Sequence, residues 1–151
     1  MANDQRDNDV TNRRILEELQ GDGRISLAEL GRRVGLSPPA VAERVQRLER
    51  DGVITGYHAI VNPRALGYAL TTVIRIRPAP RQIPKVADLA RETPEIVECH
   101  RITGEDCFIM KATVRDVEHL EELIDAFVLY GQTTTSIVQS AAVPLRAVPA
   151  G

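Results

Sequence analysis

Residues 37–51, SPPAVAERVQRLERD, organise the first part of the chain. Ser37 can cap the free N–H groups at the start of a helix, and Pro38 suits the first helical position. The apolar side chains recur at spacings of four and three, so they form one stripe along a helix. They are Val41, Val45 and Leu48. The pattern therefore predicts an amphipathic helix that Gly52 ends.

The outer face of this helix carries small residues near its start and arginines farther along. A helix that enters the major groove of DNA needs slim side chains for close approach, then long cationic donors for phosphates and guanine edges. We predict DNA contacts from Ser37, Pro39, Ala40, Glu43, Arg44 and Arg47. A solvated helix with a Glu43–Arg47 surface pair would show the same pattern, so this stretch alone favours neither interpretation.

The preceding residues favour DNA binding. Residues 26–34, SLAELGRRV, predict a second short helix with one apolar face. Gly35 suits the left-handed conformation that closes such a helix before a tight turn into the next. Helix, glycine-containing turn, helix is the helix-turn-helix pattern. With a first helix over residues 10–20, the chain is expected to form a DNA-binding domain over residues 1–61.

The remainder of the chain alternates strand and helix patterns after a linker at residues 62–68. Six elements are predicted in the order strand, helix, strand, strand, helix, strand. They cover residues 69–77, 84–92, 95–103, 107–114, 117–129 and 133–143. This βαββαβ order is the split ferredoxin-like arrangement. The predicted fold class is therefore α+β, with a second domain over residues 69–151.

The charge of the chain is uneven. The net charge of its 151 residues is −2, yet five arginines stand against two glutamates over residues 32–50, a local charge of +3. One such module would neutralise few phosphates, so specific binding is expected to need several copies. No run approaches the roughly 20 apolar residues of a membrane helix, and the N-terminus lacks a signal-peptide pattern. We therefore expect a cytoplasmic protein without a membrane partner.

The two cysteines and three histidines show no metal-binding spacing. Pairing Thr103 with Asp106 across the turn before the third strand would set Cys99 opposite Met110, so a disulfide to Cys107 is not expected. No nucleophile-elbow, phosphate-loop or dinucleotide motif is present. We expect no metal, no cofactor and no catalytic residue.

Three stretches resemble the Lrp/AsnC family, the leucine-responsive or feast/famine regulators. They are GRISLAELGRRVGLSPPAVAERVQRLERDGVITGYHAIVNPRALG at 23–67, HRITGEDCFIMKATV at 100–114 and YGQTTTSIVQS at 130–140. The resemblance implies a winged-type helix-turn-helix followed by a ferredoxin-like (RAM) domain, which binds amino-acid effectors and assembles dimers into octamers. The opening helix departs from the family pattern: Asp9 matches one of two usual aspartates, but Asn12 stands at the other.

The resemblance also implies an effector site built from two segments. The predicted residues are Gly104, Glu105 and Asp106 in a turn, and Gln132, Thr133 and Thr135 near the last strand. Asp106 would receive an α-ammonium group, and N–H groups of the turn would face an α-carboxylate. From residue types alone, an ordinary hairpin turn is favoured at 104–106, while β-propensity and ligand binding explain the threonines equally well.

The sequence thus predicts a transcriptional regulator that binds double-stranded DNA and an amino-acid effector. It is expected to form at least a dimer, and an octamer by resemblance. Two alternatives stay open: an enzyme that resembles sirohaem decarboxylases on the same architecture, and an amino-acid sensor that assembles without DNA. The arginines on the outer face of the third helix favour DNA.

Overall fold

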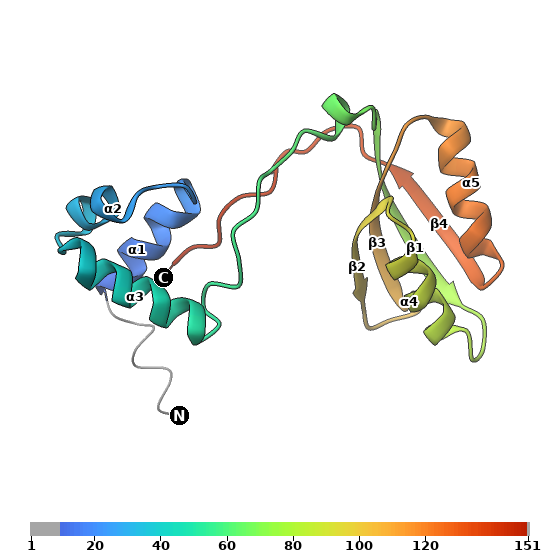
Figure 1. Cartoon of the computed structure of the whole chain (residues 1–151). Helices are drawn as coiled ribbons and strands as arrows, with labels where there is room; N and C mark the ends of the chain where they lie inside the picture. Colours follow the sequence, from blue (N-terminus) through green and yellow to red (C-terminus); the bar gives the residue numbers. More distant parts are fainter. Residues whose placement is uncertain (1–9, 151) are drawn as a thin grey trace. The chain divides into compact units, whose positions relative to one another are not determined.

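A computed structural model describes residues 10–150, which divide into two compact units (Figure 1). Among these residues, the first unit comprises 10–60 with 143–150, and the second comprises 61–142. The last residues therefore pack with the first unit, whereas the sequence prediction placed them in the second domain. Two hydrogen bonds between Gln20 and Val148 hold them there. No described helix is long and apolar enough to cross a membrane.

The first unit is built from three helices: α1 at Val10–Gly21, α2 at Leu27–Val34 and α3 at Pro38–Arg50. Their apolar stripes pack together, as the spacing predicts. The buried residues of this core are Ile15, Leu30, Val34, Val41, Val45 and Leu48. The predicted helix-turn-helix and the stripe on α3 are confirmed.

The second unit contains four strands and two helices after a 3-10 turn at Pro63–Leu66. The elements are β1 Leu70–Pro78, α4 Ile83–Glu92, β2 Ile96–Arg101, β3 Phe108–Val114, α5 Val117–Val128 and β4 Gly131–Ile137. The strands pair antiparallel in the order β2-β3-β1-β4, with β1 and β3 central. This confirms the predicted βαββαβ order and the α+β class.

One face of the sheet carries both helices. Side chains of α4, α5 and alternate positions of β1 and β3 share a single buried core, which includes Ile74, Met110, Val86 and Phe127. The other face, here called the open face, carries the intervening residues of each strand. They include Val73, Arg75, Arg77, Ile109, Lys111, Gln132, Thr134 and Ser136. No described helix of this unit packs on the open face, because both helices contribute to the opposite core.

The limits of β4 differ from the prediction of residues 133–143. The strand begins at Gly131, opposite Pro78, and ends at Ile137, opposite Thr72. The Val138 N–H still donates to the Thr71 carbonyl at 2.9 Å, but the regular ladder with β1 does not continue beyond Ile137. Strand propensity alone could not locate this end, because a strand extends only as far as its ladder.

The pairing of β2 with β3 agrees with the predicted turn. Cys99 lies opposite Met110 in the ladder, as expected from a turn that pairs Thr103 with Asp106. Cys99 and Cys107 are both free thiols. Partial desolvation raises the pKa of the Cys99 thiol, although the residue is exposed.

Candidate DNA interface and effector site

The start of α3 is fixed by a side-chain cap and by two glycines before it. The Ser37 hydroxyl accepts a hydrogen bond from the Ala40 N–H at 3.4 Å. A Cβ atom on Gly31 of α2 would lie 2.6 Å from the carbonyl oxygen of Leu36, so α2 and the turn meet where only glycine fits. Gly35 closes α2 at φ 76°, in the left-handed region that glycine tolerates. These contacts set the angle at which α3 leaves the turn.

The predicted DNA contacts at this helix start are open to solvent. Ser37, Pro39 and Glu43 are exposed, and Ala40 is half-buried. A helix N-terminus carries N–H groups without intrahelical partners and the positive end of the helix dipole. The start of α3 therefore combines slim side chains with a surface that suits phosphate.

The two predicted arginine contacts have different surroundings. Arg47 donates to Glu43 at 3.0 Å in a largely exposed pair, which contributes little free energy and can be exchanged for another anion. Arg44 is half-buried and donates to Oδ1 of Asn12 in α1 at 2.8 Å. Asn12, which stands at the family's second aspartate position, is 8% exposed. Arg44 therefore connects α3 to α1.

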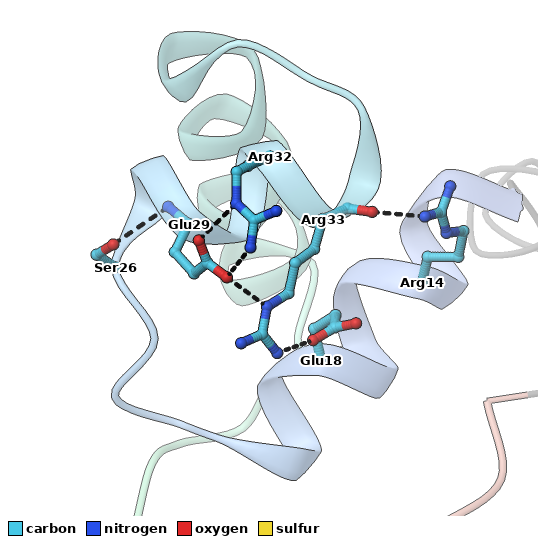
Figure 2. A network of polar contacts seen from close by, with 6 residues as sticks. All are labelled: Arg14, Glu18, Ser26, Glu29, Arg32 and Arg33. Carbon is cyan, nitrogen blue, oxygen red and sulfur yellow. Dashed lines mark hydrogen bonds and ion pairs between the residues drawn. The ribbon is translucent and has the colours of Figure 1, made fainter.

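A polar network joins α1 and α2 (Figure 2). Glu29 accepts hydrogen bonds from Arg32 at 2.6 and 2.8 Å and from Arg33 at 2.8 Å. Arg33 also donates to Glu18 at 2.7 Å, and its carbonyl accepts from Arg14 at 2.5 Å. The hydrogen bonds from Arg32 and Arg33 lower the pKa of Glu29 to about 2. Arg32 and Arg33, two of the five arginines in the positively charged stretch at 32–50, thus form ion pairs within the first unit.

The segment after α3, residues 53–60, contains no helix or strand but is tied to α3. The Tyr57 hydroxyl donates to Glu49 at 2.8 Å. Partial burial, followed by this hydrogen bond, raises the pKa of Tyr57 to about 12. Val53 and Ile54 pack against the three-helix core. The segment is therefore anchored beside α3 at its beginning.

The turn between β2 and β3 is held to β1 by ion pairs. Asp106 lies 3.5 Å from Nη1 of Arg75, and Glu105 pairs with Arg77. Gly104 has φ 111°, which other residues rarely adopt, and no described atom lies within 4 Å of where its Cβ would be. Asp106, the carboxylate predicted to receive an ammonium group, is thus already paired with Arg75. The space beside the neighbouring Gly104 is open.

The structure separates the predicted residues of β4. Gln132 is exposed on the open face. Thr133 and Thr135 are half-buried on the helix-covered face, in register with Ile76 and Ile74. The Thr135 hydroxyl has no hydrogen-bond partner among the described residues. Within one subunit, only Gln132 therefore shares a face with the charged turn.

Arg75 and Arg77 connect the two predicted segments, and the sequence prediction missed both. They lie opposite Thr134 and Gln132 on β4, while their guanidinium groups reach the turn at 104–106. Their alternation with buried isoleucines in the first strand was a usable signal. Two cations on the outward face of a central strand need anionic neighbours, and the turn supplies them.

His119 is held by contacts within the second unit. His119 is buried at the start of α5, where its Nε2 lies 3.1 Å from Glu95 and its Nδ1 accepts from the Arg115 N–H at 3.3 Å. Its own N–H donates to Asp116, the cap of α5, at 2.8 Å. These contacts give His119 a structural role. Within residues 10–150 no three His, Cys, Asp or Glu side chains gather as metal ligands do.

Comparison with known proteins finds two family matches along the chain. Residues 8–55 match the winged helix-turn-helix DNA-binding family, and residues 71–148 match the Lrp/AsnC ligand binding domain. An uncharacterized HTH-type transcriptional regulator of Bacillus subtilis, YezC, is 40% identical over 132 residues, 87% of this chain and 94% of that protein.

Two further relatives agree. The leucine-responsive regulatory protein of Escherichia coli is 42% identical over 122 residues, 79% of this chain and 74% of its own. A crystal structure of a Neisseria meningitidis transcriptional regulator in complex with L-Met has a TM-score of 0.87 and 26% identity, covering 93% of this chain and 96% of that one. The chain therefore belongs to the Lrp/AsnC family of transcriptional regulators, with an N-terminal DNA-binding domain and a C-terminal ligand-binding domain.

Proposed function

We propose that the protein reads an operator through α3 and senses an amino acid beside the turn at residues 104–106, acting by binding rather than by catalysis. The observation that carries the DNA-binding part is the capped, exposed start of α3, held against α2 where only Gly31 fits. A helix start of this kind can enter a major groove as a rigid element.

Contacts to DNA divide along α3. Ser37 and the N–H groups beside it would hold a phosphate, while Pro39 and Ala40 allow close approach. Arg47 would exchange its exposed pair with Glu43 for a phosphate or a guanine edge. Arg44 would lie beside the major groove of the DNA, and its hydrogen bond to Asn12 would hold α3 in position against α1.

The amino-acid site follows from charge complementarity. A free amino acid carries one cation, its ammonium group, and one anion, its carboxylate. Arg75 and Asp106 likewise supply one cation, a guanidinium group, and one anion, a carboxylate. The ammonium would bind Asp106 and the carboxylate would bind Arg75, so the ligand replaces one ion pair with two. The related regulator with bound L-Met supports an amino acid as the ligand class. Thr133 and Thr135, on the other face of β4, would enter the site only through the contact between subunits.

The assembly would follow from the open face. Val73 and Ile109 lie on it between charged side chains, and no described helix of this unit covers them. Packing against a second copy would bury them, which gives a dimer at least. An octamer is the state that the family resemblance implies. A dimer also presents two helix-turn-helix units, as a two-fold operator requires.

The test is a gel shift on the DNA upstream of the gene, with and without each of the twenty amino acids. Arg47→Ala should bind the operator more weakly than wild type. Arg91→Ala is the matched control, because Arg91 forms a similar exposed pair with Asp88 in the second unit. Equal binding by wild type, Arg47→Ala and Arg91→Ala would remove α3 from the interface.

A further inference from the structure

Val148, in the last described part of the chain, is bound to α1 by one side chain. Nε2 of Gln20 donates to the carbonyl oxygen of Val148 at 3.0 Å, and Oε1 of Gln20 accepts from the N–H of Val148, also at 3.0 Å. A primary amide offers one donor and one acceptor side by side, as a neighbouring strand would. Gln20 therefore binds the Val148 backbone as a strand partner does.

The tail has the sequence to be bound in this way. Pro144 and Pro149 cannot continue a helix, and Pro149 biases the residue before it towards an extended backbone. Val148 therefore presents its N–H and carbonyl groups without a partner from regular structure. Backbone groups of this kind need hydrogen bonds from elsewhere. The two prolines also lower the entropy lost when the tail is fixed.

The tail borders a groove on the first unit. A cavity of about 940 Å³ lies between the last turns of α1, the segment at 53–60 and the tail. Its lining includes Leu16, Leu19, Ile54, Tyr57 and Pro149. The side chain of Val148 itself is 74% exposed. Docking thus rests on the two backbone hydrogen bonds more than on buried side chains, and exposed hydrogen bonds are readily exchanged with water.

We propose that this groove is the docking site of the chain's own C-terminal tail, and that the docked tail is a releasable strap through which the ligand-binding unit acts on the DNA-binding unit. The tail follows β4, the strand that carries Gln132, after residues 138–142, so the chain joins the two units at the tail as well as at the linker. A shift of β4 on ligand binding would pull on the strap. The coupling part rests on the effector response proposed above.

Limited trypsin digestion tests the docking in the full chain, because trypsin cleaves after Arg146, two residues before Val148. Gln20→Ala should raise the cleavage rate at Arg146 about two- to tenfold, the factor for losing one or two exposed hydrogen bonds. Gln20→Glu, which keeps the acceptor and loses the donor, should give a smaller rise. Glu17→Ala, one turn earlier on α1 and also exposed, should cleave like wild type. Equal rates in all four proteins would overturn the proposal.

A crosslink identifies whose tail occupies the groove. Gly21→Cys, which keeps Gln20 and has open space around its Cβ position, is combined with Val148→Cys, Cys99→Ser and Cys107→Ser, and the two cysteines are joined by a short bis-maleimide. The proposal expects a crosslinked monomer on a denaturing gel. A crosslinked dimer would make the tail of a second copy the occupant and contradict docking within the chain.

Operator affinity then tests the coupling, with L-methionine and L-leucine as probes. Gln20→Ala should lose at least about half of the shift in operator affinity seen in wild type and Glu17→Ala, while its unliganded affinity stays the same. An equal shift in all three proteins would overturn the strap and leave the proposed function intact. If neither amino acid shifts operator affinity in any of the three proteins while tail cleavage still depends on Gln20, the effector response and the coupling are contradicted and the docking stands.

Discussion

The contacts that shape the start of α3 join residues close in the sequence, whereas those that hold the turn at 104–106, the proposed effector site, join residues far apart in it. Ser37 bonds to a residue three positions away, and Gly31 meets the carbonyl of Leu36 five positions on. Glu105, by contrast, pairs with Arg77, 28 positions earlier, across the sheet. The start of α3, the proposed DNA-reading element, is therefore specified locally, while the turn at 104–106, the proposed effector site, depends on strand pairing. Substitutions near the start of α3 should therefore destabilise the first unit alone. Substitutions on the sheet should affect the turn at 104–106 through the residues paired with them on neighbouring strands.

The largest effect is expected from Gly31→Ala. The new Cβ would stand 2.6 Å from a backbone oxygen that cannot move without opening the turn, so we expect a loss of about 3 kcal/mol in the free energy of unfolding. Urea unfolding followed by circular dichroism measures it.

Gly21→Ala is the control for that substitution, because no described atom lies within 4 Å of its Cβ position. It should leave stability unchanged or slightly raised. If Gly31→Ala unfolds at the same urea concentration as Gly21→Ala, close packing of Gly31 against the Leu36 carbonyl does not stabilise the turn.

The next largest effect separates Arg44 from Arg47. Because Arg44 donates to the buried Asn12, Arg44→Ala should destabilise the first unit by about 2 kcal/mol, the range for a hydrogen bond to a charged group. Arg47→Ala removes only an exposed pair and should change stability by less than about 0.5 kcal/mol. A double-mutant cycle of Arg44→Ala with Asn12→Ala measures the coupling. Additive losses would show that the two side chains do not act together.

In the ligand-binding unit, Asp106→Ala should weaken amino-acid binding about tenfold or more by removing the partner of the ammonium group. Gly104→Arg should block the same space sterically. Calorimetry with the twenty amino acids measures both. Asp88→Ala, which removes an exposed paired aspartate of α4, should bind like wild type. An amino acid that binds wild type and Asp106→Ala equally well would move the site elsewhere.

The elements themselves could be predicted from sequence, since each helix has one apolar stripe, β1 alternates apolar with polar residues, and β4 is rich in β-branched residues. The cap Ser37, the turn at Gly35 and the Cys99–Met110 register were also predictable, because they depend on near neighbours. Arg75 was missed because its partner Asp106 becomes a neighbour only once the strands pair. The Gln20–Val148 contact spans 128 positions and leaves no periodic trace in the sequence.

The smallest effect is a pH dependence within the network of Figure 2. Hydrogen bonds from Arg32 and Arg33 lower the pKa of Glu29 from 4.5 to about 2. A carboxyl with a depressed pKa stabilises the fold fully above its ordinary value and loses that contribution as the pH falls through the lowered one. The stability difference between wild type and Glu29→Gln should therefore shrink as the pH falls from 4.5 towards 2. A difference that stays constant over this range would contradict the assigned hydrogen bonds.

The central claim, that α3 reads DNA and the turn at 104–106 senses the amino acid, is tested most directly by measuring both affinities in the same two variants. Arg47→Ala should lose about 1–3 kcal/mol of operator binding and keep the wild-type affinity for the amino acid. Asp106→Ala should lose the amino acid and keep the operator affinity measured without ligand. If either variant lost both affinities while remaining folded, or if neither lost its own, the assignment of the two functions to these residues would be contradicted.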